Sequence, residues 1–339
     1  MIIDNNGDET INALLATAAT DIVLTHDTMY MLDAPITIPT GKTLRAADGD
    51  NVVIKAKDTY AAGLMFAQYF TDNWKLRNIT IDGNYGMRTA QEAVAESRTI
   101  EISGGSGCIV EHCDFNNHPS AVFWAYNHTN PTVRHNKFSE CFHPIRIDGN
   151  NIVGGGGTFH NNRLVNTAAF KSIQGIECVN TNGIVITKNY IRGMGLQEPT
   201  SHGFEGTWGN GIYIFNSTLF TIANNDSGAG WWSGFVIGAN ATFGTVERNV
   251  FSRGTVSVAA GWIEQAGNAD NIIDRNIING GSLVGDLGGE RCEITNNVYN
   301  LDVAQTALDI STEARTCLVQ GNVFTNTSGS QAGNGMYVW

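Results

Sequence analysis

The stretch Val133-Arg134-His135-Asn136-Lys137-Phe138 has the form apolar-x-x-Asn-x-apolar, and this form returns six more times along the chain. The further copies begin at Phe159, Ile186, Val246, Ile273, Ile294 and Val319. Weaker copies begin at Leu76, Val110 and Ile222. The Asn slots stand at positions 79, 113, 136, 162, 189, 225, 249, 276, 297 and 322, so the steps run from 21 to 36 residues. A period of this size with short apolar segments indicates one supersecondary unit that is stacked many times.

The composition supports a solenoid of short strands and tight turns. The 339 residues include 39 Gly, 36 Asn and only 6 Pro, and Gly and Asn tolerate the left-handed backbone that tight turns need. The length exceeds the usual limit for a single core, but each coil of a solenoid buries its apolar side chains only against its neighbours. We therefore expect one elongated domain without long helices.

Charge and hydropathy argue against two classes of partner. The formal charge is −12 with only seven Lys, and nucleic-acid affinity comes from phosphate neutralisation by Lys and Arg. No apolar run of about 18 residues is present, so no membrane-spanning segment is expected. The start at Met1 lacks the basic and apolar regions of a signal peptide. We expect an extracellular or virion-associated protein that is exported by another route or has lost its leader.

The six cysteines are interpreted mainly as small buried side chains in the core of the stacked coils. Three of them lie five residues before an Asn slot, namely Cys108, Cys292 and Cys317. Cys178 lies in an apolar segment that is expected to face inward. Cys292 and Cys317 belong to successive coils about 4.8 Å apart, so a bridge between them is geometrically conceivable. The sequence leaves the disulfide status open.

Residues 1–73 are predicted to form an N-terminal cap and the first, irregular coils, and residues 74–339 the regular coils of one continuous domain. An apolar stripe with helical spacing lies near the start, at Ile11, Leu14, Leu15 and Ala18. The polar residues Asp8-Glu9-Thr10 offer a capping residue, so a short amphipathic helix should cover the open end. The last apolar segment reaches Trp339, and we expect a partner chain or another domain to cover this C-terminal end of the solenoid.

The order strand, turn, strand, Asn at a tight turn, short strand and variable loop resembles the right-handed parallel β-helix of the pectin-lyase-like superfamily. This superfamily includes polysaccharide lyases, glycoside hydrolases, uronan epimerases and phage tailspikes. The resemblance covers about four fifths of the chain and implies an all-β, single-stranded solenoid of about ten regular coils. The Asp-Pro-His, Asn-Thr-Asp and Arg-x-Pro-x-x-Arg motifs of particular families are absent, so the resemblance indicates fold and not activity.

The resemblance also implies a cleft over the first strand of each coil. Strand alternation predicts that the outward residues of this strand are Glu101, Phe123, Arg146, Glu177, Tyr213, Val236, Ser257, Val284 and Asp309. Ionisable side chains concentrate early in this row, between the two longest entering loops, residues 83–97 and 192–210. Long additions to a minimal repeat usually carry function, so the candidate site is placed between them.

Each candidate also has a purely structural explanation. Glu177 and Arg146 on adjacent rungs could form a cross-strand ion pair that only stabilises the ladder. Asp148 could simply begin a turn, Tyr213 could be a half-buried aromatic residue, and His143 could bond backbone groups beside its Pro. A loop punctuated by Gly has no core to serve, which favours function for its polar and aromatic members, His202, Glu205 and Trp208.

Hydrolysis of a glycan needs a carboxylic acid and a carboxylate about 5 to 9.5 Å apart. Glu177 could act with Asp148, whose α-carbon should lie about 8 Å away, or with Glu205. Glu101, about 14 Å from Glu177, suits a neighbouring sugar subsite. We therefore expect a polysaccharide depolymerase of the glycoside hydrolase type.

Two alternatives stay open. β-Elimination needs a cation to neutralise a uronate and a base for its C5 proton, and Arg146 with Lys171, His202 or Tyr213 could supply them. The second alternative is a tailspike-like adhesin that binds glycan without cleaving it. The acidic total and the carboxylates of the row favour hydrolysis.

The expected partner is a polysaccharide or oligosaccharide. His143 and Tyr213 are predicted to bind it together with three tryptophans, Trp208, Trp231 and Trp232, whose flat faces suit sugar rings, although Trp231-Trp232 could instead seal a loop. The resemblance to tailspikes suggests a homotrimer. No cofactor is expected, and the sequence indicates no metal site, Ca²⁺ included.

Overall fold

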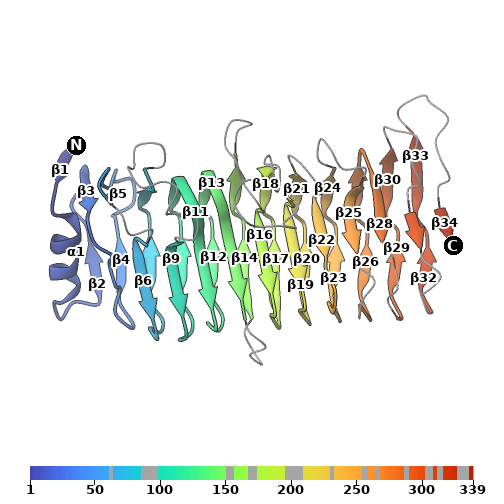
Figure 1. Cartoon of the computed structure of the whole chain (residues 1–339), viewed down its shortest axis with the longest axis horizontal. Helices are drawn as coiled ribbons and strands as arrows, with labels where there is room; N and C mark the ends of the chain where they lie inside the picture. The colour runs from blue at the N-terminus through green and yellow to red at the C-terminus, as the bar shows by residue number, and fades with distance from the viewer. Residues whose placement is uncertain are drawn as a thin grey trace.

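The structure is a computed structural model of the whole chain. It describes residues 1–60, 64–84, 98–149, 156–166, 174–194, 209–229, 233–253, 259–263, 268–285, 290–301, 308–310, 316–326 and 336–338. Within these ranges the chain forms short parallel strands and a single helix. Figure 1 shows the strands stacked as coils along one long axis, with the two termini at opposite ends.

Each coil contributes one strand to each of three faces, and every strand pairing within a face is parallel. Face 1 is a sheet of 12 strands. Its strands are β2 Asp21–Val23, β4 Thr43–Arg45, β7 Lys75–Arg77, β10 Ile109–Glu111, β12 Thr132–Arg134, β14 Gly157–His160, β17 Ile184–Thr187, β20 Thr221–Ala223, β23 Thr245–Glu247, β26 Ile272–Asp274, β29 Glu293–Thr295 and β32 Leu318–Gln320.

Face 2 follows face 1 along each coil, beyond the Asn slot. Its strands are β1 Ile2–Asp4, β3 Thr28–Leu32, β5 Val53–Ala56, β8 Thr80–Asp82, the first halves of β11 Asp114–Tyr126 and β13 Lys137–Asp148, β15 Arg163–Val165, β18 Tyr190–Met194, β21 Asp226–Ala229, β24 Val250–Ser252, β27 Ile277–Asn279, β30 Val298–Leu301 and β33 Val323–Asn326.

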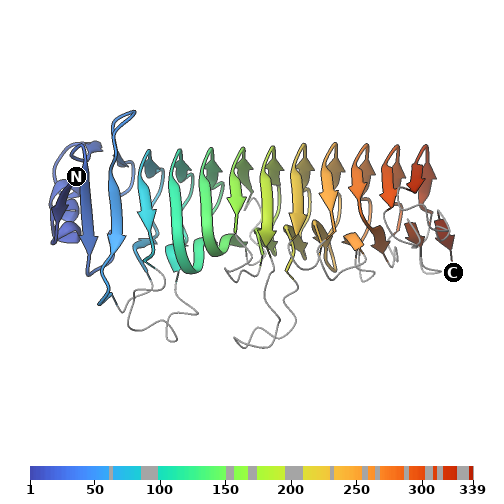
Figure 2. The same ribbon diagram turned by 90° about the horizontal axis from the view of Figure 1, so that it is seen from above.

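Face 3 completes each coil. Its strands are β6 Phe66–Tyr69, β9 Arg98–Ser103, the second halves of β11 and β13, β16 Ile176–Val179, β19 Ile212–Phe215, β22 Phe235–Ile237, β25 Ala259–Ile263, β28 Ser282–Gly285, β31 Leu308–Ile310 and β34 Met336–Val338. Because β11 and β13 run through the corner without interruption, faces 2 and 3 join into one 22-stranded sheet. Figure 2 shows these two long strands curving around the side of the solenoid.

The Asn slots form a continuous hydrogen-bonded ladder at the turn between faces 1 and 2. Its members are Asn136, Asn162, Asn189, Asn225, Asn249, Asn276, Asn297 and Asn322. At each step Nδ2 of one Asn donates to Oδ1 of the Asn in the next coil over 2.9 to 3.1 Å. The backbone N–H of the first Asn donates to the same oxygen. Every ladder Asn thereby links two coils through side chain and backbone.

The residue before each ladder Asn adopts the left-handed conformation, with φ between +52° and +69°. In seven of the eight turns this residue carries a side chain, and Gly321 takes the position only in the eighth. The left-handed residue turns the chain sharply, so the following Asn points inward. There the Asn side chain bonds the backbone groups that the turn leaves without backbone partners. The prediction that the repeated Asn residues face inward at one turn is therefore confirmed, and face 1 has ten strands from β7 onward, as expected.

Apolar side chains fill the space between the faces. On face 3 an inward row runs through Ile100, Phe123, Ile145, Ile176, Ile212 and Phe235, all fully buried. On face 2 the rings of Phe115 and Phe138 stack with centroids 4.9 Å apart. Each coil buries its side chains against the next coil, which is how a solenoid of this length forms one core.

The predicted N-terminal capping helix is present as α1, Gly7–Leu15. Its residues Ile11 and Leu15 are buried against the first coil, and Figure 1 places the helix across the N-terminal end. The helix begins before Asp8, so Asp8 lies in the first turn and does not cap it. Ala18 lies beyond the helix and is exposed, so the predicted stripe is one residue too long. No helix in the described ranges is long and apolar enough to cross a bilayer.

We predict that Asn189→Ala weakens the solenoid locally. Asn189 Nδ2 donates to the Phe159 carbonyl oxygen at 2.9 Å and to Asn225 Oδ1 at 3.0 Å, and its Oδ1 accepts from Asn162. Alanine leaves these buried groups without partners, which should lower the local free energy of unfolding by about 2 to 4 kcal/mol. Hydrogen exchange of the Asn162 amide measures this directly.

Asn161→Gly is the matched control, because Asn161 lies in the adjacent turn, is exposed and has φ +52°, which glycine accepts. An Asn162 amide equally protected in the two variants would show that the ladder contributes little.

Candidate functional site

The outward row of face 3 holds a cluster of charged and aromatic side chains. Strand register places Ala67, Glu101, Trp124, Arg146, Glu177, Tyr213 and Val236 in this row, and it continues through the backbone positions of Trp262, Val284, Asp309 and Tyr337. Among the first seven residues the ionisable ones lie between Glu101 and Tyr213, and they are followed by the apolar Val236, which is buried. The charged part of the row is where the sequence placed the candidate site.

Two positions of the row differ from the prediction. Phe123 pairs with Ile100 and Ile145 in the inward row and is fully buried, so Trp124 takes the outward position. The cause is a register shift in β11 between His118 and Ala121, which changes the phase of the alternation.

Further along the chain, the position expected for Ser257 belongs by register to Trp262. Residues 254–258 lie outside the described part of the chain. A sequence signal for the true phase exists. Each of the four residues Glu101, Trp124, Arg146 and Glu177 lies three residues before the first residue after its strand, which is Gly104, Asn127, Gly149 and Asn180 respectively.

Glu177 is the centre of the cluster. Its side chain is 8 % exposed, and its Oε2 lies 3.4 Å from Arg146 Nη1 and 3.2 Å from His143 Nε2. The His143 side chain is 6 % exposed, so the predicted substrate-binding histidine is placed behind Glu177, within the wall of the solenoid. It reaches there because β13 continues through the corner between faces 2 and 3.

Burial shifts the pKa of both Glu177 and His143. It raises the pKa of Glu177, an effect that Arg146 opposes and Asp148 reinforces. Burial also lowers the pKa of His143 to about 3, and the Arg146 charge acts in the same direction. Burial therefore shifts the pKa of each group in the direction that favours its neutral form.

Several buried polar atoms around Glu177 have no hydrogen-bond partner among the described residues. They are His143 Nε2, Arg146 Nε, Trp124 Nε1, Gln174 Oε1 and, at the edge of the cluster, Arg98 Nε. The 3.2 Å approach of His143 to Glu177 is close enough for an ion pair but lacks the angle of a hydrogen bond. Such groups are rare in folded proteins, and their concentration here makes this part of face 3 the candidate functional surface.

Trp124 is held between two arginines. The Arg98 guanidinium carbon lies 3.5 Å from a ring centroid of Trp124, and that of Arg146 lies 4.5 Å from it. Arg98 also pairs with Glu101 at 2.9 Å. The predicted subsite residue Glu101 is thus partly neutralised, and the sequence did not identify Trp124 or Arg98 as members of the cluster.

Asp148 and Tyr213 flank Glu177. Asp148 lies two residues beyond Arg146 on β13, and its Oδ1 accepts from Asn180 Nδ2 at 3.3 Å. Its charge raises the pKa of Glu177, so the two carboxyl groups interact electrostatically. Tyr213 follows Glu177 on the next rung, half-buried, with its ring parallel to that of Phe215. The structure therefore brings together five predicted residues: Arg146, Glu177, Asp148, His143 and Tyr213.

The other predicted site residues are Glu205, Lys171, His202, Trp208, Trp231 and Trp232, which lie outside the described residues. Their roles stay predictions. His118, by contrast, is buried and bonds Thr99 Oγ1 at 2.6 Å and the Ile81 carbonyl oxygen at 3.0 Å, as expected of a structural histidine.

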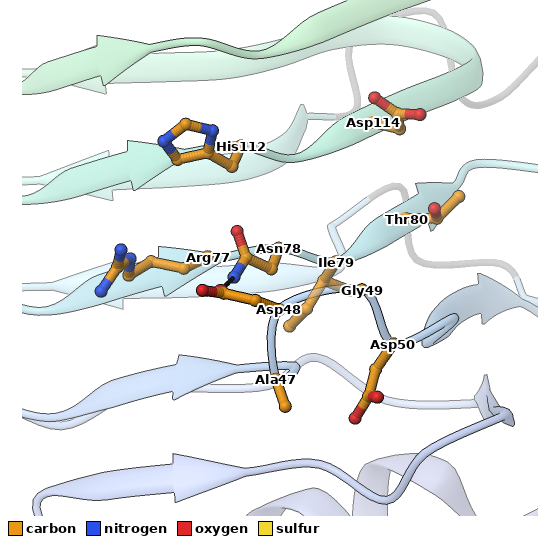
Figure 3. Close-up of a pocket in the computed structure, with 10 residues that line it drawn as sticks. All are labelled: Ala47, Asp48, Gly49, Asp50, Arg77, Asn78, Ile79, Thr80, His112 and Asp114. Carbon is orange, nitrogen blue, oxygen red and sulfur yellow. Dashed lines mark hydrogen bonds between the residues drawn. The ribbon is translucent and has the colours of Figure 1, made fainter.

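A hollow of about 510 Å³ lies elsewhere, at the outer side of the turns between faces 1 and 2 near the N-terminal end. Figure 3 shows Asp48, Asp50 and Asp114 around it, with Asn78 donating to Asp48 Oδ1 at 2.6 Å. Its acids and its histidine are exposed or half-buried, whereas Glu177 and His143 are buried in contact with each other, so it is not the favoured site. No group of three or more potential metal ligands is found within the described residues.

Comparisons with known proteins agree with this fold. A family described as "Right handed beta helix region" matches residues 39–191, and no curated protein matches the sequence. The structure is similar to the A-module of mannuronan C-5 epimerase AlgE4 from Azotobacter vinelandii, with 14% identity, a TM-score of 0.61, and coverage of 98% of this chain and 92% of that one.

Two other similar structures have different descriptions. The Streptococcus pneumoniae surface protein and adhesin PfbA has 10% identity and a TM-score of 0.64, covering 98% of this chain and 94% of its own. DFA-IIIase from Arthrobacter chlorophenolicus A6 without its lid has 13% identity and a TM-score of 0.61, covering 99% and 95%. At these identities the likeness shows the fold alone, and the predicted right-handed parallel β-helix is confirmed.

We predict that Glu177→Gln is more stable than the parent at neutral and alkaline pH. Because the folded pKa of Glu177 is raised, the stability from its protonated form is complete below the ordinary value of 4.5 and is lost as pH rises through the folded pKa. Glutamine stays neutral throughout. Urea unfolding at about pH 8 and about pH 4 should show an advantage for the variant only at the higher pH.

A variant less stable than the parent at about pH 8 would contradict this, because it would show that Arg146 holds Glu177 as a stabilising carboxylate.

Proposed function

We propose that this protein is a glycan-cleaving enzyme of the glycoside hydrolase type, with Glu177 as the general acid. The observation that carries the proposal is the buried Glu177 on the outward row, whose pKa is raised by burial and which contacts His143 and Arg146 and interacts electrostatically with Asp148. Hydrolysis of a glycosidic bond uses a carboxyl group with a raised pKa as the acid and a second carboxyl group near it.

Each residue has a distinct role in this scheme. Glu177 donates its proton to the glycosidic oxygen as the bond breaks, and the Asp148 carboxylate activates water or attacks the sugar carbon. The Arg146 charge stabilises the carboxylate that forms on Glu177. His143, kept neutral by burial, lies behind Glu177 and orients its carboxyl group.

The spacing of Glu177 and Asp148 is compatible with this chemistry. They lie one rung and two residues apart by register, which separates their α-carbons by about 8 Å. A carboxyl separation of about 6.5 to 9.5 Å leaves room for a water molecule and leads to inversion, and a shorter one leads to retention. Glu205 remains the proposed alternative partner from an entering loop.

We predict that Glu177→Gln lowers the rate of glycan cleavage by about 100-fold or more, because a positioned general acid contributes about that factor. The measurement is release of reducing ends from a panel of bacterial and algal polysaccharides. Glu247→Gln is the control, because Glu247 lies on face 1, where it pairs with Arg275 and Arg248. Full activity of Glu177→Gln on a substrate that the parent cleaves would refute the assignment.

A second candidate function is β-elimination on a uronic-acid glycan. It is favoured by the two guanidinium groups on Trp124, which place two cations next to each other on the row of an otherwise acidic chain. Arg146 would neutralise the uronate, with Lys171, His202 or Tyr213 as the base. The mannuronan C-5 epimerase with the same fold makes a uronan substrate a natural member of the test panel.

Arg146→Gln separates the two functions. Because the Arg146 charge lowers the pKa of Glu177, its loss in a hydrolase should move the alkaline limb of the pH–rate profile upward while cleavage continues. In a lyase the same change should abolish the unsaturated product that absorbs near 235 nm. Arg192→Gln is the control, because Arg192 lies on face 2 and pairs with Asp226.

Binding of a glycan without either product would support the adhesin alternative. An extracellular or virion-associated location and a homotrimeric state remain proposals that accompany each of these functions.

A further inference from the structure

We propose that Cys292 and Cys317 form a thiol–disulfide exchange site, which closes to a disulfide between two successive coils when it meets a small-molecule disulfide. The proposal does not depend on the glycan-directed function. The site lies on the edge of face 1, at the beginning of strands β29 and β32.

The two cysteines occupy the same position on neighbouring coils. β29 and β32 pair with Glu293 opposite Leu318, and the Leu318 N–H donates to the Cys292 carbonyl oxygen at 2.9 Å. Cys292 and Cys317 immediately precede this pair, so their α-carbons are separated by about 4.8 Å. Disulfides form across about 4.4 to 6.8 Å, and the two thiols already share a hydrogen bond.

The other four cysteines lack such a neighbour. All six lie in the described part of the chain, and register places Cys141 opposite His118, and Cys178 opposite Ile147 and Ile214. Cys108 and Cys113 likewise face no cysteine, and burial raises the pKa of all four thiols. These four are buried as the sequence predicted, and so is Cys292, whereas Cys317 is half-buried.

The pair is chemically asymmetric. The hydrogen bond from Cys292 lowers the pKa of Cys317, so Cys317 is the more readily ionised of the two thiols. The same hydrogen bond and burial raise the pKa of Cys292. Cys292 is 1% exposed and Cys317 is half-buried, so a reagent reaches the more nucleophilic sulfur first.

The exchange proceeds in two balanced steps. The Cys317 thiolate attacks one sulfur of the small-molecule disulfide, whose S–S bond breaks and releases one thiolate, which leaves a mixed disulfide on Cys317. Cys292 then loses its proton and attacks the Cys317 sulfur, which releases the second small thiolate. The protein dithiol is oxidised by two electrons, and one small disulfide is reduced to two thiols.

Closure would fasten the coil of β32 and β33 to the coil before it. This coil exposes Leu318, Val323 and Phe324, and Asn322 is the last member of the ladder. A solenoid unit is held only by its neighbours, so a covalent link at this position should restrict opening of the coil.

The test incubates the reduced full chain with defined mixtures of oxidised and reduced glutathione, followed by acid quench, alkylation and mass spectrometry. We expect loss of two hydrogens from the intact chain and one cross-linked peptide containing Cys292 and Cys317, with the other four cysteines alkylated. Limited proteolysis of residues 316–326 should be at least about tenfold slower in the oxidised chain.

Matched variants separate the exchange site from mere exposure of a thiol. In Cys292→Ala the mixed disulfide with glutathione should accumulate on Cys317, and Cys317 should react more slowly at neutral pH because it loses its hydrogen-bond donor. Cys178→Ala should behave as the parent does. A parent chain that keeps both thiols at every glutathione ratio, or that stops at the mixed disulfide, would overturn the proposal.

Discussion

The buried amide ladder at the turn between faces 1 and 2 is the interaction on which the rest of this structure depends. A tight turn removes backbone partners in every coil, and an inward Asn restores them while bonding the next coil. Because each Asn satisfies groups in two coils, a missing member leaves several buried groups unpaired. The ladder therefore sets the register of every strand that leaves the turn.

The same ladder explains why the fold could be predicted from sequence. A side chain that must occur once per coil at a fixed point in a turn leaves a period in the sequence, and the inward apolar strokes share that period. The adjacency of Arg146 and Glu177 followed from it, because positions equivalent in successive coils lie one rung apart. At Cys113 the slot lacks Asn, yet its backbone N–H still donates to Asn136 Oδ1, so the ladder begins there.

The parts of the site that could not be predicted lie where the period breaks. The register shift in β11 exchanges Phe123 and Trp124 between core and surface, and simple alternation cannot detect it. His143 was expected at the substrate, but the unbroken β13 carries it into the wall behind Glu177. Both misplacements occur in the two coils whose strands continue through the corner, where no turn separates face 2 from face 3.

The location of the polar cluster follows from the same geometry. A buried carboxyl group with unpaired polar neighbours destabilises a protein, and it persists only where the surrounding structure fixes it in place. In a solenoid that support comes from the adjacent coils, and the coil of Glu177 has ladder members on both sides, Asn162 and Asn189. A position further along the row, such as Val236, holds an apolar side chain, which does not destabilise the fold in this way. The continuous Asn ladder thus makes the stacked coils rigid, and the candidate site occupies a few adjacent coils of face 3.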